Sequence, residues 1–294
     1  MTVSFRARTV ILTAVSMTAF AANSVLARIA LLGATVDAAS FTTIRLASGA
    51  VTLALIMRVT AGDSPKTDGD AGIRGSWASA LMLFLYAAPF SFAYVGLTTA
   101  TGALILFGLV QVTMIAGALL LGERPTAAQW LGLSLAFVGL VYLMLPGIEA
   151  PPLSSALLMA LAGFSWGLYS LSGRNAVDPL GETTGNFARS VLLVVGMTLV
   201  TLPGLHIEPA GVLLAVTSGT LASGIGYVLW YAALRGLTAT NAGVVQLSVP
   251  ILAAAGGVAF LSEAITLRLA LSALLILGGI AVAVLGRAPS HVEG

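Results

Sequence analysis

The stretch that decides the fold is LTTATGALILFGLVQVTMIAGALLLGERPT, residues 97–126, because the chain repeats it in outline. A shift of 140 positions aligns it with LTATNAGVVQLSVPILAAAGGVAFLSEAIT, residues 237–266, and superposes Glu123 on Glu263. Both stretches are apolar and long enough to cross a bilayer. Internal duplication in a membrane chain is typical of a transporter whose binding site lies between two halves.

The composition excludes an ordinary soluble protein. Of the 294 residues, 58% are hydrophobic and 8% are charged, and the mean hydropathy is +1.03, whereas soluble domains carry about 25% charged residues. The chain has no cysteine, its two histidines are His206 and His291, and no phosphate-binding glycine loop is present. We therefore expect no metal site, no cofactor and no enzymatic activity.

Ten apolar segments of membrane length follow one another along the chain. They are 10–32, 38–58, 77–97, 102–122, 126–146, 153–173, 184–204, 210–234, 240–262 and 266–286. An odd number of crossings per half inverts the second half relative to the first. We predict an all-α integral membrane protein of ten transmembrane helices, arranged as two inverted five-helix repeats (1–148 and 149–294) around a central cavity.

The positive charges predict the orientation, since basic residues collect on the cytoplasmic side. With the N-terminus inside, nine basic residues face the cytoplasm and only Arg268 faces out. The nine are Arg6, Arg8, Arg58, Lys66, Arg74, Arg124, Arg174, Arg235 and Arg287. We therefore expect both termini in the cytoplasm. A cleaved signal peptide at the N-terminus is the alternative, but the first apolar run continues to Leu32, which favours a retained helix.

Polar side chains at membrane depth are the first candidates for a binding site. Asn23, Gln111 and Gln246 each place an amide inside an apolar segment, where it needs a partner. Hydrogen bonding between helices and contact with a solute are both open readings. Deep aromatic residues are the second set, and we expect them to form the cavity wall: Tyr86, Trp166, Tyr169 and Tyr227. Trp77, Trp130 and Tyr94 lie near segment ends and are expected at the membrane interface.

Arg45 and Arg189 occupy the second segment of each half, where a shift of 144 superposes them. A charge at this depth needs neutralisation or water. We expect a structural role, in which both bond carbonyl groups of neighbouring helices; binding of a substrate carboxylate is the alternative. Arg28, near the outer end of its segment, is expected to snorkel. Pro89 and Pro250 lie near the centres of their segments and are expected to act as kinks or hinges.

These features resemble the drug/metabolite transporter superfamily, in its ten-helix branch of two EamA-type repeats. The resemblance is carried by the two arginines, by Glu123 in LGERPT, by Glu263 in LSEAIT and by QLSVP at 246–250. It implies a basket of ten helices lined by segments one, three, four, six, eight and nine. It also implies export of amino acids, other metabolites or drugs, and the aromatic lining is most similar to exporters of aromatic and neutral amino acids.

The resulting hypothesis is a multi-pass transporter of the bacterial inner membrane that exports neutral amino acids or related metabolites by alternating access. Its partners would be a small solute and the lipid bilayer, with no nucleic acid, and it would function as a monomer. Because no Asp or Glu lies at mid-membrane depth, we expect neutral or zwitterionic solutes. A multidrug or cation exporter of the same fold is the main alternative, and a scramblase or other non-transporting membrane protein is a weaker one.

Overall fold

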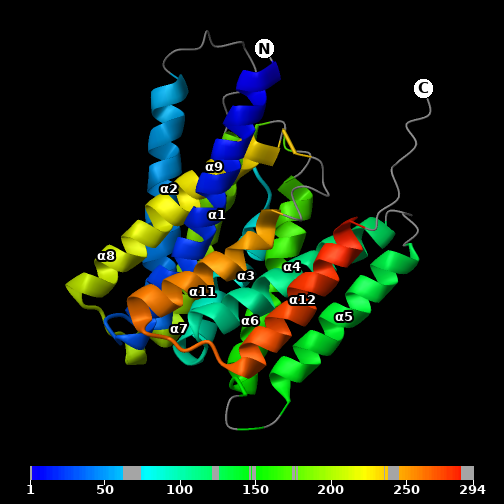
Figure 1. Cartoon of the computed structure of the whole chain (residues 1–294). Coiled ribbons are helices and arrows are strands. Elements are labelled where there is room, and N and C mark those ends of the chain that lie inside the picture. Colours follow the sequence, from blue (N-terminus) through cyan, green and yellow to red (C-terminus); the bar gives the residue numbers. More distant parts are fainter. Residues whose placement is uncertain are drawn as a thin grey trace.

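The structure is a computed structural model, and it describes residues 2–285 apart from 62–73, 121–125, 146, 148–149, 174–175, 177, 235 and 238–244. Within this part of the chain the secondary structure is helical, apart from a bridge between Val36 and Ile207. The elements are α1 (Thr2–Leu32), α2 (Ala38–Ala61), α3 (Trp77–Gly96), α4 (Thr99–Leu120), α5 (Ala127–Met144), α6 (Leu153–Gly173), α7 (Pro179–Thr201), η1 (Leu202–Gly204), α8 (Pro209–Thr217), η2 (Ser218–Ile225), α9 (Gly226–Leu234), α11 (Ser248–Leu261) and α12 (Leu267–Leu285) (Figure 1).

Several predicted features lie outside the described residues: Lys66, Glu123, Arg124, Arg174, Arg235, Arg287 and His291. The described residues contain eight helices long and apolar enough to cross a membrane, one of which is the continuous rod of α8, η2 and α9. Two further apolar helices, Ser248–Leu261 and Leu267–Ala283, are shorter. The ninth predicted segment, 240–262, is described only from residue 245. The chain is therefore a multi-pass helical protein, and the count of ten crossings stays a prediction.

Side-chain caps fix where several helices begin. Ser76 accepts a hydrogen bond from the backbone N–H of Ser79 at the start of α3, and Asp178 caps α7 in the same way. Thr126 and Gln129 form a reciprocal capping box at the start of α5. Each cap satisfies backbone donors that the first helical turn leaves without a partner.

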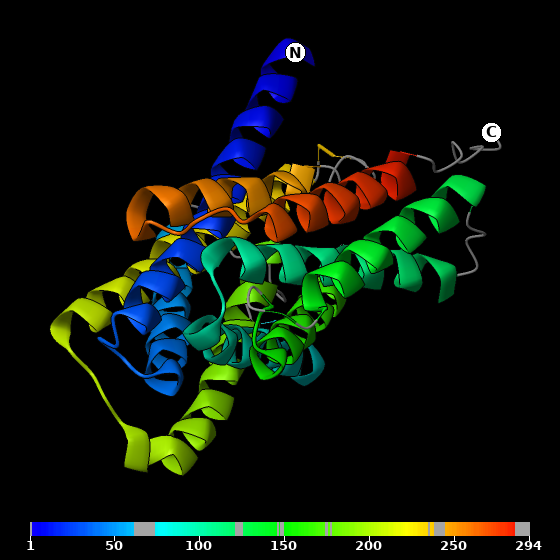
Figure 2. The same cartoon turned by 60° about the horizontal axis from the view of Figure 1, so that its bottom comes forward.

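Helix contacts recur in two matching sets. α3 and α4 of the first half pack on α6 of the second half, and in the same way α9 and α11 of the second half pack on α1 of the first. Helices at equivalent places in the two halves also pack on each other: α2 on α7, α4 on α11 and α5 on α12. α5 and α12 lie together at one edge of the bundle, away from α2 and α8 (Figure 1, Figure 2). A Cβ on Gly132 would collide with the carbonyl oxygen of Gly279, and a Cβ on Gly279 with that of Gly132. Small residues thus let these two backbones touch, as is common between helices in lipid.

The surface carries many large apolar side chains, as a lipid-facing surface requires; Phe260, for example, is 75% exposed. Trp77 and Trp130, which are predicted at the membrane interface, lie in the first turns of α3 and α5 and are exposed. Tyr94 is an exception to that prediction because it is fully buried. Its ring packs edge-on against Phe90, with 4.7 Å between centroids.

α1 begins and α12 ends toward the same end of the bundle (Figure 1). We call this end the inner end and the opposite end the outer end, following the predicted topology. The junctions of α1 with α2, of α3 with α4, and of α11 with α12 then lie at the outer end.

Candidate functional site

A buried arginine lies at the centre of the bundle. Arg45 of α2 is 1% exposed, and its Nη2 donates to the hydroxyls of Tyr86 (2.9 Å) and Tyr227 (3.3 Å). Its Nε donates to Ser223 Oγ at 3.0 Å, and its Cζ lies 4.9 Å from the ring centroid of Phe90. These contacts join α2 and α3 of the first half to η2 and α9 of the second. The sequence led us to expect that Arg45 bonds carbonyl groups of neighbouring helices. Its partners among the described residues are instead side-chain hydroxyl groups.

Asn23 extends this network to α1. It is buried, its Nδ2 donates to the Tyr86 hydroxyl at 3.2 Å, and its Oδ1 accepts a short hydrogen bond from Ser218 of η2. The Tyr86 hydroxyl thus accepts from both Asn23 and Arg45. Five helical elements meet on a few polar atoms, which gives the centre of the bundle a fixed arrangement.

Trp166 of α6 is the centre of an aromatic cluster beside this network. Its ring lies 4.8 Å from Tyr86, 4.7 Å from Tyr227 and 5.9 Å from Phe20 between centroids. Tyr169 stacks on its other side at 5.5 Å with an interplanar angle of 29°. Such ring pairs stabilise a packed wall by about 0.5–1.5 kcal/mol each beyond the area that they bury.

A small cavity lies between the polar network and the aromatic cluster. Its volume is about 10 Å³, which is room for about one water molecule. It is lined by Phe20, Asn23, Ser24, Tyr86, Phe90, Leu106, Phe107, Trp166 and Tyr227. Four predicted site residues, Asn23, Tyr86, Trp166 and Tyr227, are therefore brought together around one space. A solute larger than water would need these helices to separate.

The π-helix η2 places the two serines of the network. In a π-helix each N–H bonds to the carbonyl five residues earlier, so Ser218 and Ser223 fall on nearly the same side. One contacts Asn23 and the other contacts Arg45. Close approach to α2 is possible because Gly219 has no side chain: a Cβ there would collide with the Arg45 carbonyl oxygen.

The remaining predicted residues lie elsewhere. Gln111 of α4 and Gln246, just before α11, are buried but do not line the central cavity. Pro89 is buried inside α3 and cannot donate to the carbonyl of Leu85. Pro250 lies in the first turn of α11, which begins at Ser248, rather than in the middle of a helix as predicted. Proline is readily tolerated there because first-turn N–H groups have no helical acceptor.

Arg189 differs from Arg45 although the two are equivalent in the repeat. Its Nη1 donates to the carbonyl oxygens of Arg74 (2.9 Å), which precedes α3, and of Gly185 (3.0 Å), one turn earlier in its own helix. It ties α7 to the residues that precede α3. The two intramembrane arginines therefore have different surroundings: carbonyl groups for Arg189 and hydroxyl groups for Arg45.

A second small cavity of about 10 Å³ lies toward the inner end. Tyr169 and Tyr231 line it together with Ser79, Thr183, Asn186 and the carboxylate-bearing Glu182. Tyr169, which stacks on Trp166, thus separates this polar cavity from the central aromatic cluster. Polar contacts also join the two halves near this end: the backbone N–H of Ser76 donates to Asn186 Oδ1 at 3.0 Å, and Arg189 donates to the Arg74 carbonyl oxygen.

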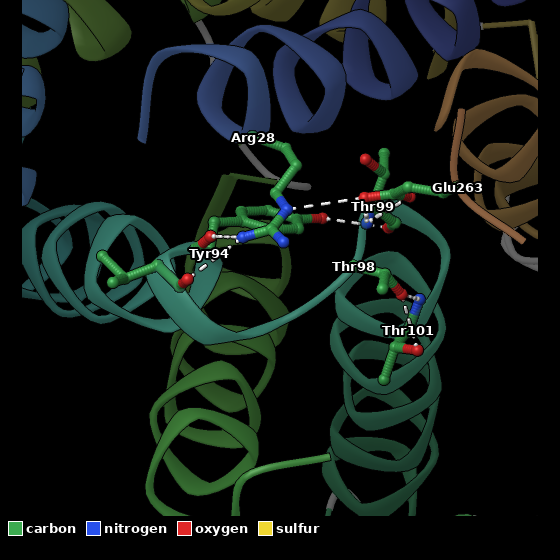
Figure 3. A network of polar contacts seen from close by, with 7 residues as sticks. Arg28, Tyr94, Thr98, Thr99, Thr101 and Glu263 are labelled. Atoms are coloured by element: carbon green, nitrogen blue, oxygen red, sulfur yellow. Dashed lines mark hydrogen bonds and ion pairs between the residues drawn. The ribbon is translucent and has the colours of Figure 1, made fainter. Parts of the chain in front are cut away.

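At the outer end an ion pair connects the two halves (Figure 3). Arg28 Nε lies 3.4 Å from Glu263 Oε1, and its Nη1 donates to the carbonyl oxygens of Tyr94 (2.8 Å) and Val95 (3.0 Å). Both oxygens of Glu263 accept from the backbone N–H of Thr99, at 3.0 and 2.9 Å. We call Arg28, Glu263 and Thr99 the outer latch. Arg28 is buried in this latch and does not snorkel, contrary to the prediction.

A second outer contact joins the α1–α2 turn to the residues before α8. Asp37 N donates to His206 O (2.9 Å), and Asp37 Oδ2 accepts from His206 N (3.0 Å). Asp37 Oδ1 also accepts from Ser40 N at the start of α2. Burial raises the pKa of this carboxyl, but the hydrogen bonds from His206, Ser40 and Ala39 lower it more, so the net pKa lies below its ordinary value of 3.8.

No group of three or more metal-ligating side chains occurs among the residues described. The sequence pattern of the EamA-like transporter family matches residues 7–145 and again 153–285. The chain is 49% identical over 284 residues to "Uncharacterized protein PA1977" of Pseudomonas aeruginosa, with 96% of this chain and 97% of the relative covered. A protein of known crystal structure superposes with a TM-score of 0.63 at 20% identity, covering 92% of this chain and 98% of its own, a likeness of fold alone.

Proposed function

The chain belongs to the EamA-like transporter family and is a multi-pass membrane protein, and from this premise we propose that it exports neutral amino acids or related small metabolites across the bacterial inner membrane. The two halves, 1–148 and 149–294, act as inverted five-helix repeats. Three observations support this arrangement: the family pattern matches twice, the helix contacts come in two matching sets, and the central network draws on both halves.

The observation that carries the substrate class is the pairing of a polar network with an aromatic wall around one cavity. Asn23, Tyr86 and Tyr227 offer hydrogen bonds to the polar end of a solute, and Trp166 faces its apolar side chain. Gln111 and Gln246 belong to α4 and to the approach to α11, which pack on each other. In this proposal they contact the solute when the cavity widens.

The outer latch and the Asp37–His206 contact hold the halves together at the outer end. Alternating access requires such contacts to break when the cavity opens outward. The described state is closed at the outer end, and its central cavity is too small for an amino acid. Export then consists of loading from the inner end, closure over the solute, and rupture of the outer latch.

The two alternatives have less support. No Asp or Glu lines the central cavity, and the positive Arg45 stands beside it, which disfavours a cationic drug. A scramblase needs a hydrophilic path that is open to lipid. The groove between α1 and the α8–η2–α9 rod, about 510 Å³, is lined mostly by apolar side chains such as Ala14, Leu221 and Leu229.

The test is uptake of labelled Phe, Thr and Met by proteoliposomes that contain the purified protein, with and without a pH gradient. We expect saturable uptake with mutual competition, and unlabelled amino acid inside the vesicles should accelerate it by exchange. Uptake no greater than that of empty vesicles for all three would contradict the amino-acid proposal. Preferential uptake of an organic cation would favour the cation exporter instead.

A further inference from the structure

Arg45 carries a positive charge for which the described residues provide no counter-charge. The ion pairs found among them involve Arg28 and His206, whereas the partners of Arg45 are neutral hydroxyls. A guanidinium group remains protonated in proteins. An ion buried without an opposite charge beside it costs several kcal/mol, so this position strongly favours the approach of an anion.

The hydrogen-bond pattern around the central cavity is rich in donors. Arg45 Nη1 is buried and has no hydrogen-bond acceptor among the described residues, and the same holds for Trp166 Nε1. Trp166 lines the cavity, and Arg45 directly contacts three residues that line it: Tyr86, Phe90 and Tyr227. Buried donors without acceptors are rare in folded proteins, so each of these two calls for a water, an ion or a bound solute as its acceptor.

We propose that Arg45 recognises an ionised carboxylate on the transported solute, with the Tyr86 and Tyr227 hydroxyls as neighbouring donors. The proposal rests on the transport function above and narrows it to carboxylates with an apolar or aromatic side chain. The rings of Phe20 and Trp166 receive that side chain. The same rings can accommodate an amino group through cation–π contact, so zwitterions are accepted along with simple carboxylate anions. Amines and uncharged amides are rejected.

Arg189 provides the matched control. It is the repeat equivalent of Arg45, but its bonds to the carbonyl oxygens of Arg74 and Gly185 lie away from the cavity. Arg189→Gln removes an intramembrane guanidinium without touching the proposed site, whereas Arg45→Gln removes the charge at the site. A structural role for intramembrane arginines in general would affect both variants alike.

The experiment is binding to the purified full-length protein in detergent, measured by ligand-induced thermal stabilisation. The probes are 3-phenylpropionate, 3-phenylpropionamide and 3-phenylpropylamine, which share a ring and differ in the end group. We expect the carboxylate to bind at least tenfold more tightly than the amide, about 1.4 kcal/mol, and the amine not to stabilise the protein. Arg45→Gln should lose at least tenfold in carboxylate affinity, and Arg189→Gln should keep it.

Equal stabilisation by the amide or amine, no stabilisation by any probe, or unchanged carboxylate binding in Arg45→Gln would each overturn the proposal. If Arg45→Gln does not fold, Tyr227→Phe takes its place, because it removes one donor and keeps the ring; it should weaken carboxylate binding but not amide binding. Binding requires no transport. Carboxylate binding without amino-acid uptake would contradict only the proposed function, and uptake by a protein that ignores the carboxylate would contradict only this inference.

Discussion

Glu263→Gln should loosen the outer latch without changing its shape. The glutamine can still accept from the Thr99 N–H, but the pairing with Arg28 at 3.4 Å becomes neutral. Both side chains are about one-tenth exposed, at 11% and 10%, so solvent screens the pair little. Hydrogen bonds to charged groups contribute about 1.5–3 kcal/mol and neutral ones about 0.5–1.5. We therefore expect the closed state to lose about 1–2 kcal/mol of stability relative to the outward-open state. This loss raises the outward-open population roughly tenfold.

The absence of cysteine makes this population measurable. A single Ser24→Cys substitution places a thiol in the wall of the central cavity, at a position that is 2% exposed. In the predicted orientation, a membrane-impermeant maleimide added outside intact cells labels this thiol only when the outer end opens. Glu263→Gln in this background should raise the labelling rate about tenfold, in proportion to the open population.

Glu208→Gln is the matched control, since Glu208 also lies at the outer end but pairs with His206 on the surface, where its side chain is 52% exposed. Its labelling rate should equal that of the parent, because exposed ion pairs contribute little. An unchanged rate in Glu263→Gln would refute the idea that the latch holds the outer end closed. Equal acceleration by both variants would attribute the effect to surface charge instead.

Trp166→Ala should strongly reduce transport while yield and monodispersity stay close to wild type; Trp130→Ala, which removes a ring that is 57% exposed, should transport normally. Gly219→Ala should lower the melting temperature by several degrees because its Cβ meets the α2 backbone, whereas Gly196→Ala, with nothing within 4 Å, should gain about 0.5–1 kcal/mol. The pKa of Asp37 is lower in the folded state than its ordinary value of 3.8, so ionised Asp37 stabilises the fold above pH 3.8, and this stabilisation is lost as the pH falls through the folded pKa. The melting temperature of Asp37→Asn should therefore depend less on pH below 3.8 than that of the wild type.

The parts of the site that the sequence predicted follow from the cost of burying polar groups in lipid. Asn23 was singled out because an amide needs a partner at membrane depth, and it bonds Tyr86 and Ser218. Deep aromatic residues were expected at a cavity wall, and Tyr86, Trp166 and Tyr227 line one. Lipid does not solvate polar side chains, so those at membrane depth turn toward the protein interior, and hydropathy is enough to identify them.

The rest depended on long-range geometry that periodicity does not contain. Arg45 and Ser223 are 178 residues apart, and Arg28 and Glu263 are 235 apart. A serine satisfies its hydroxyl within its own helix at small cost, so Ser223 gave no sign of a special role. The π-helix was also invisible, because nothing in SGTLASGI distinguishes i+5 from i+4 hydrogen bonding. The prediction for Arg28 was wrong because the sequence does not distinguish an arginine that snorkels from one that pairs with a distant carboxylate.

The π-helix makes this site sensitive to chain length as well as to side-chain chemistry. One residue corresponds to a rotation of roughly 100° and a rise of 1.5 Å in an α-helix. A regular α-helix over the same residues would place Ser218 and Ser223 roughly 140° apart, so they could not contact Asn23 and Arg45 from the same side. Surface loops tolerate insertions and deletions. Here, by contrast, the number of residues in each turn determines which side chains reach Asn23 and Arg45.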